Sequence, residues 1–348
     1  MIFEPDIFSD SKPKWKLLKD ENMNVFEELV KFIPNNYFSK LSSCYYSGAF
    51  EINSLNYKLE DINKNIIILK KWPRNKTIIE VNKIQELINW LYSENISVPK
   101  SGIFIDNKLT FNFQNSIWSY NIFKDGDYYS GIDGEFENAA IVTGKLHQAL
   151  KKTPLKISPK IGFKYFSKQD NLVFEKIRKS RNSWGKFLSN EHSDFLNFHW
   201  DYLFSCWESL KNDKIFSGDS IPCHFDMHPH NLITKNGEIS AVLDFESVNV
   251  MPIGYSLAFN ALKQCRQYIS LDNEISNYKQ VGDLYISNLF SEFKMKEIEN
   301  YNFCKLSKTE VLRRICNIFH ANLVHKNKSW NHVLPVQIAH LYESEKLF

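Results

Sequence analysis

The sequence changes its pattern at Asp125-Gly126-Asp127, a predicted turn, and this change limits the folds open to the chain. Before the turn, short apolar runs suited to β-strands surround one long helical pattern. After it, helical patterns dominate, with one short β-like stretch at 231–247. A chain of 348 residues is long enough for about two domains. We therefore expect an α+β fold with a small N-terminal lobe, residues 1–124, and a larger, mostly helical lobe, residues 125–348.

The N-terminal lobe is predicted to hold an antiparallel sheet and one main helix. Residues 65–72 form an apolar, β-branched run that Pro73 closes, which favours a strand. In residues 77–94, apolar side chains recur every three to four positions, as on one face of an amphipathic helix. The other expected elements are a helix at 24–32, strands at 49–59, 103–105, 109–113 and 117–123, and helices of the larger lobe at 138–151, 192–211, 253–268 and 308–326.

Composition excludes several classes of protein. Hydrophobic residues make up 43% and charged residues 24% of the chain, the usual mix of a folded soluble protein. The formal net charge of +3 is too small to predict binding to nucleic acid or to an anionic membrane. No apolar run approaches the roughly 18 residues of a membrane span, and the six cysteines form no Cys-x-x-Cys pair. We expect a cytoplasmic protein with reduced thiols, either a monomer or a homodimer.

The densest group of polar and ionisable residues is the motif His224-Phe225-Asp226-Met227-His228-Pro229-His230-Asn231. Pro229 and its polar neighbours favour a loop, so Asp226 and Asn231 can approach each other from its two ends. Asp244 follows an apolar run and would stand at a strand end, where a carboxylate can reach a cleft. Two aspartates and an amide oxygen suit Mg²⁺ held against phosphates, with one carboxylate left to orient a hydroxyl.

Two short patterns in this order, His-x-Asp-x-His-x-x-Asn and Leu-Asp-Phe-Glu, resemble the aminoglycoside phosphotransferase and choline kinase superfamily. Its homoserine-kinase-like and spore-coat kinase-like branches are the most similar. The resemblance implies a bilobal protein-kinase-like fold that binds ATP and Mg²⁺ between its lobes and phosphorylates a hydroxyl of a small molecule. It implies that Asp226 is the catalytic base and that Asn231 and Asp244 bind the metal ion.

The resemblance also implies a lysine at the end of the apolar strand that reaches the α- and β-phosphates. Lys70 is the candidate, and Lys71 is the alternative, because a slip of one residue turns a side chain to the other face. The next helix should present a glutamate to this lysine. Glu80 lies on the apolar stripe of that helix, whereas Glu86 points away from it, which favours Glu80. The resemblance adds four nucleotide-binding residues, in a covering loop (Gly48 and Asn53) and in a linker near 120–126 whose backbone meets the adenine (Tyr120 and Ile122).

Other residues near the motif have expected roles as well. The resemblance makes His224 a residue that braces the loop by hydrogen bonding. Phe225 stands where the family commonly has glycine, and Ser256 stands where many members carry an aspartate that braces the loop. Two roles stay possible for Glu246: contact with a second metal ion, or a hydrogen bond to a backbone amide.

Two other functions stay open at this stage. His224, Asp226, His228 and His230 alternate in a way that could bind Zn²⁺ or the dinuclear centre of a metal-dependent hydrolase. The remaining histidines, however, form no second ligand motif. The chain could also be a non-catalytic kinase-like binding protein, against which the intact set of reacting residues argues.

The acceptor stays open between a sugar, an amino alcohol and an aminoglycoside-like compound. A polycationic aminoglycoside requires an acidic pocket, but residues 151–215 carry 13 basic and 7 acidic side chains. This imbalance favours a neutral or anionic hydroxyl compound.

Overall fold

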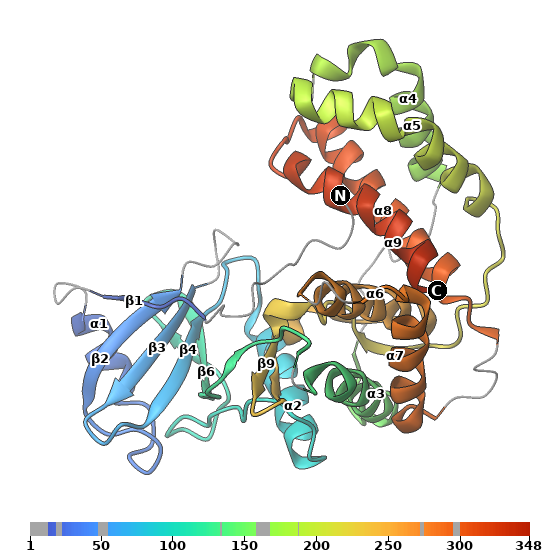
Figure 1. Cartoon of the computed structure of the whole chain (residues 1–348). Helices are drawn as coiled ribbons and strands as arrows, with labels where there is room; N and C mark the ends of the chain where they lie inside the picture. Colours follow the sequence, from blue (N-terminus) through green and yellow to red (C-terminus); the bar gives the residue numbers. More distant parts are fainter. Residues whose placement is uncertain are drawn as a thin grey trace.

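The structure joins an N-terminal β-sheet to a larger helical lobe, which confirms the predicted α+β class (Figure 1). The computed structural model describes residues 13–18, 23–47, 55–132, 134–157, 168–186, 188–271, 275–294 and 300–348. The N-terminal elements are β1 (Lys16–Leu17), α1 (Met23–Val30), β2 (Leu41–Ser47), β3 (Leu55–Asp61), β4 (Ile66–Lys71), α2 (Ile78–Ser93), β5 (Phe111–Phe113) and β6 (Ser116–Ile122). The later helices are α3 (Glu135–Lys152), α4 (Lys168–Lys179), α5 (Asn190–Leu210), α6 (Ile253–Leu271), α7 (Tyr278–Glu292), α8 (Phe303–His325) and α9 (Leu334–Leu347). The later strands and 3₁₀ turns are β7 (Asp127–Tyr128), η2 (Arg181–Lys186), β8 (Ser220–His224), η3 (Pro229–Asn231), β9 (Leu232–Lys235), β10 (Glu238–Val242), η4 (Phe245–Ser247), β11 (Val248–Pro252) and η6 (Asn331–Val333).

Strand β4 lies inside a six-stranded antiparallel sheet with the order β1-β2-β3-β4-β6-β5. Along β4, successive side chains point to opposite faces of the sheet, so Ile67 and Leu69 share one face and Lys70 lies on the other. Ile67 and Leu69 are fully buried in a core that includes side chains of α1. Lys70 therefore points away from this core.

Helix α2 anchors the sheet on the larger lobe. It begins with a capping box: the Thr77 hydroxyl accepts the Glu80 N–H (3.2 Å), and the Glu80 carboxylate accepts the Thr77 N–H (2.8 Å). Its apolar face, predicted from the helical periodicity, contributes Leu87, Ile88 and Leu91 to a buried cluster with side chains of α3, β10 and η4. Packing thus holds the two lobes against each other along α2.

Two small antiparallel sheets of the larger lobe position the polar motif. Strand β8 pairs with β11, and a second sheet has the order β10-β9-β7. The motif loop leaves β8 at His224 and enters β9 at Leu232, while Asp244 follows the end of β10. Figure 1 shows β9 between the N-terminal sheet and the helices α3 and α6.

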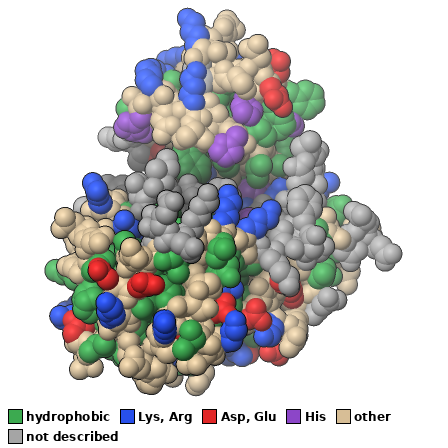
Figure 2. Space-filling model, turned by 90° about the vertical axis from the view of Figure 1, so that its left-hand side faces the viewer, with side chains coloured by type: hydrophobic (Ala, Val, Ile, Leu, Met, Phe, Trp, Pro, Cys, Tyr) green, Lys and Arg blue, Asp and Glu red, His purple; other side chains and the backbone are tan. Residues whose placement is uncertain are grey.

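The surface and the helices carry two further observations. On the lower part of the face shown in Figure 2, Lys and Arg side chains are interspersed with Asp and Glu. Within the described ranges, every helix is too short or too polar to cross a membrane.

Most predicted elements form with slightly shifted ends, such as β4 for 65–72 and α2 for 77–94. The strand predicted at 103–105 is wrong, because the N–H of Phe104 donates to the carbonyl of Lys108 (2.8 Å) and closes a turn there. The structure adds the strands β1, β2, β7, β8 and β11 and the helices α4, α7 and α9 to the predicted elements. The predicted strand at 49–59 corresponds to β3, and its first residues lie outside the described part of the chain.

Candidate active site

The strand pairings bring the motif loop and Asp244 to one end of the two small sheets. His224 is paired with Val248 across β8 and β11, and Leu232 with Val242 across β9 and β10. Between these pairs, the N–H of Leu243 donates to the carbonyl of Asn231 (2.8 Å). The backbone that carries Asn231 is therefore fixed to the backbone that carries Asp244.

Asn231 and Asp244 present oxygen atoms suited to a hard cation. Asn231 is buried, and its Nδ2 donates to the carbonyl of Asp226 (2.8 Å). Its Oδ1 accepts no hydrogen bond from the described residues. Asp244 adopts a left-handed conformation, with φ 61° and ψ 57°, and its carboxylate makes no capping hydrogen bond to η4. A carboxylate and an amide oxygen left available in this way fit a magnesium ion.

Asp226 lies beside an imidazole and a guanidinium group. Its Oδ2 lies 3.5 Å from Nε2 of His228, and its Oδ1 lies 4.0 Å from Nη2 of Arg314. Burial raises the pKa of Asp226, but His228, Arg314 and more distant cations outweigh it and hold the pKa below its ordinary value. The carboxylate is therefore ionised at neutral pH and can accept a hydrogen bond from a hydroxyl.

Lys70 crosses from the N-terminal sheet to this site. Its ammonium forms an ion pair with the carboxylate of Glu246 and lies 4.4 Å from the ring centroid of Trp72. Glu246 stands two residues after Asp244. Burial raises the pKa of Asp244, and the negative charges of Glu246 and Asp226 act in the same direction, whereas Lys70 opposes them. The lysine is thus close enough to act electrostatically on Asp244.

The predicted partner of Lys70 is wrong. The carboxylate of Glu80 accepts hydrogen bonds from the N–H and the hydroxyl of Thr77, because Thr77 and Glu80 have the spacing of a capping box. Glu246, which lies outside the N-terminal lobe, takes the place expected for a glutamate of α2. The sequence Thr77-Ile78-Ile79-Glu80 already carried this signal.

The two residues predicted to meet the adenine lie inside β6 and not in a linker. The carbonyl of Tyr120 accepts the N–H of Gly102 (2.8 Å), and the N–H of Ile122 donates to Lys100 (2.9 Å). These backbone groups are therefore already satisfied by partners within the N-terminal lobe. Gly48 and Asn53 lie outside the described residues.

Helix α6 braces the motif loop with three polar side chains spaced four residues apart, one turn after another. Ser256 Oγ and Asn260 Nδ2 donate to the carbonyl of His224 (3.2 and 3.0 Å). Asn260 Oδ1 accepts the N–H of Met227 (3.2 Å), and Gln264 Nε2 donates to the Met227 carbonyl (3.1 Å). These neutral groups supply the bracing that the resemblance assigned to an aspartate at position 256.

His224 also has a clear bracing contact. Its Nε2 donates to the carbonyl of Leu243 (2.8 Å), and the ring is fully buried. Burial lowers the pKa of His224, which favours the neutral ring. His224 therefore fastens the start of the motif loop to the strand end before Asp244.

Replacing Asn260 with alanine should destabilise the protein by roughly 1–3 kcal/mol, because it leaves the buried N–H of Met227 without its acceptor. Urea denaturation followed by circular dichroism measures this change. Asn288→Ala is a matched control, since Asn288 is only half-buried and its side chain donates to Leu284 of its own helix. Equal stability of both variants would contradict the bracing role of Asn260.

A family comparison decides the class of the protein. A model of the family described as "Phosphotransferase enzyme family" matches residues 51–265, which include β4, the motif loop and Asp244. The chain belongs to this phosphotransferase family. The predicted resemblance and the predicted enzyme class, a small-molecule kinase with a hydroxyl acceptor, are confirmed. No curated protein sequence matches the chain.

Solved structures share the fold of this phosphotransferase at low sequence identity. An amicoumacin kinase in complex with AMP-PNP, Ca²⁺ and Ami is 13% identical, with a TM-score of 0.61 over 94% of this chain and 95% of that chain. A spectinomycin phosphotransferase in complex with ADP and spectinomycin is 13% identical, with a TM-score of 0.60 over 91% and 93%. A choline kinase from Cryptosporidium parvum Iowa II is 14% identical, with a TM-score of 0.56 over 93% and 96%. The predicted bilobal kinase-like fold is thereby confirmed.

Proposed function

We propose that the protein transfers the γ-phosphoryl group of ATP to a hydroxyl of a small molecule in the presence of Mg²⁺, with Asp226 as the base. The ion pair between Lys70 and Glu246 carries this proposal, because it joins the lysine of the N-terminal sheet to the acidic end of the motif sheets. The solved structures in complex with AMP-PNP and ADP support ATP as the phosphoryl donor.

Each side chain has a role in this proposal that follows from its contacts. Asp226 orients the acceptor hydroxyl and takes its proton. When ATP binds, the ammonium of Lys70 leaves its ion pair with Glu246 and contacts the α- and β-phosphates. Asn231 and Asp244 would hold Mg²⁺, which supplies positive charge against the phosphates when bound. We further propose that residues 1–124 form the nucleotide lobe, with a linker at 123–126, and that 125–348 form the catalytic lobe.

The metal-hydrolase alternative has less support from the side-chain contacts. Nε2 of His224 donates to a carbonyl, and Nδ1 of His228 accepts the N–H of His230 (3.3 Å). In the part of the chain that the structure describes, no three His, Cys, Asp or Glu side chains form a group that could hold a metal ion.

Mg²⁺-dependent ADP release, measured with a coupled assay, tests the proposed function. Lys70→Met should lower kcat/KM for ATP by roughly 10- to 100-fold, because it removes charge-assisted contacts to the phosphates. Lys71→Met is the matched control, since Lys71 points to the opposite face of β4, 5.7 Å from the ring centroid of Trp118. We expect this variant to stay within about threefold of wild type. A larger loss at Lys71 than at Lys70 would move the phosphate contact to Lys71.

A further inference from the structure

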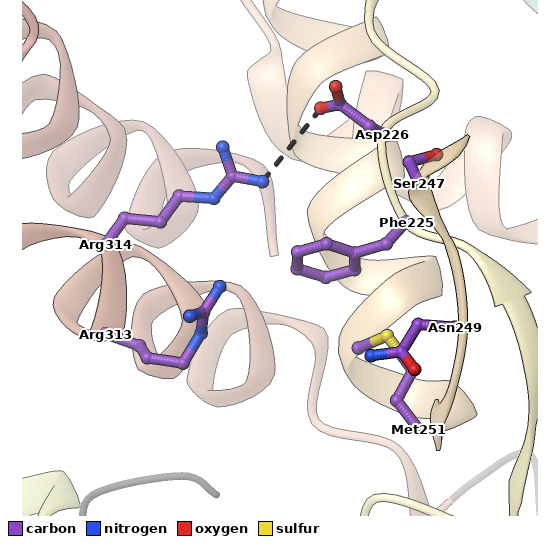
Figure 3. Close-up of a pocket in the computed structure, with 7 residues that line it drawn as sticks. All are labelled: Phe225, Asp226, Ser247, Asn249, Met251, Arg313 and Arg314. Carbon is purple, nitrogen blue, oxygen red and sulfur yellow. Dashed lines mark ion pairs between the residues drawn. The ribbon is translucent and has the colours of Figure 1, made fainter. Parts of the chain in front are cut away.

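A pocket beside Asp226 has two arginines of α8 along one side (Figure 3). Its volume of about 340 Å³ lies within the range of small-molecule sites. The residues that line it are Phe225, Asp226, Ser247, Asn249, Met251, Arg313 and Arg314. Figure 3 shows Arg313 and Arg314 reaching from α8 toward Phe225 and Asp226, with Asn249 and Met251 on the other side.

A buried carboxylate holds both guanidinium groups in place. Glu310 is fully buried, and it accepts Nη2 of Arg313 (2.6 Å) and Nε of Arg314 (2.9 Å). Arg314 also lies over the ring of Phe259, with its Cζ 4.0 Å from the ring centroid. Glu310 therefore fixes both guanidinium groups in a preorganised arrangement beside the pocket.

The lining of the pocket adds one carboxylate beside these two guanidinium groups. Asp226 is the only acidic residue among the described residues that line it. The positive charges of Arg314 and Lys263 act on the carboxylate of Asp226, and both lower its pKa. A cationic amine in this pocket would lie next to two fixed guanidinium groups, which repel it.

We propose that this pocket binds the acceptor and that the acceptor carries an anionic group, a carboxylate or a phosphate, beside its reacting hydroxyl. The proposal rests on the proposed function, because it takes Asp226 as the residue that meets the hydroxyl. The forked donors of arginine match the planar oxygens of a carboxylate and the oxygens of a phosphate. Arg314 lies 4.0 Å from Asp226, so the anionic group and the hydroxyl are separated by a few bonds.

Two sets of acceptors that differ mainly in charge test this proposal through ADP release with saturating Mg²⁺-ATP. One set is glucose, glucosamine, gluconate and glucose 6-phosphate. The other is glycerol, 3-amino-1,2-propanediol, glycerate and glycerol 3-phosphate. We expect kcat/KM for an anionic member to exceed that for its neutral and cationic counterparts by at least about tenfold. Comparison of the carboxylates with the phosphates identifies the anionic group.

Arg313 is the residue to change, because Arg314 then still pairs with buried Glu310. Arg313→Gln should lower kcat/KM for the anionic acceptor by at least about tenfold and for its neutral counterpart by less than about threefold. Arg313→Lys should recover part of the loss, since it restores the charge without the fork. Arg178→Gln is the matched control, because Arg178 is exposed on α4 and pairs with Glu175 outside the pocket.

Preference for the cationic or neutral compounds, together with no charge-dependent effect of Arg313→Gln, would overturn the anionic acceptor and leave the kinase intact. If no compound raises ADP release, the proposal is tested by the change in melting temperature that gluconate and glycerate cause. A rise in the wild type that is lost in Arg313→Gln supports the proposal, and equal changes in both proteins overturn it. Binding of Mg²⁺-ATP, measured by calorimetry, reports separately on the proposed function.

Discussion

Asp226→Asn is expected to lower the rate of ADP release by roughly 10²- to 10⁴-fold, with the binding of Mg²⁺-ATP close to that of wild type. The amide keeps the shape of the side chain but cannot take the proton of the acceptor hydroxyl. It also loses the charge that faces His228 and Arg314. Single-turnover kinetics and calorimetry with ATP separate the chemical step from nucleotide binding.

Asp201→Asn is the matched control for this experiment, because Asp201 is exposed on α5 and lies 3.7 Å from Arg181, outside the site. We expect its activity to stay within about twofold of wild type. An Asp226→Asn protein with near-wild-type turnover would remove Asp226 from the chemistry.

The patterns that repeat along the chain could be predicted from the sequence. The β-branched run of β4 and the apolar stripe of α2 are local signals, and each forms the expected element. The motif loop and Asp244 also come together, since a hydrogen-bonded strand pair lies between them. These features depend on residues that are close in sequence, or on two strands joined by a short turn.

Contacts between distant segments could not be predicted in this way. The glutamate that pairs with Lys70 lies 176 positions later in the chain, whereas the resemblance points to a glutamate of the next helix. Arg313 and Arg314 look like ordinary charged residues of α8, and only the packing of α8 against α6 puts them beside Asp226. Tertiary packing, which local periodicity does not encode, determines these positions.

Asp244→Asn is expected to lower ADP release by roughly 10³-fold and, unlike Asp226→Asn, to raise the thermal stability of the free protein at pH 7. Asparagine tolerates the left-handed backbone at this position, so the loop should keep its path. Activity falls because an amide replaces the carboxylate proposed to hold Mg²⁺. Stability rises because the folded protein disfavours the charged form of Asp244, whose pKa is raised by burial and by Glu246 and Asp226.

The two aspartates therefore have opposite effects on stability as the pH changes. The stability penalty of Asp244 is complete above its raised pKa and disappears as the pH falls below the ordinary value of 3.8, so wild type and Asp244→Asn should converge in acid. The lowered pKa of Asp226 gives a stabilising contribution that is present above 3.8 and is lost as the pH falls through the lowered value. Differential scanning calorimetry without nucleotide, from pH 3 to pH 8, measures both effects. Asp283→Asn is the control, because the Asp283 side chain on α7 is exposed. A lower melting temperature of Asp244→Asn than of wild type at pH 7 would contradict this account of the site.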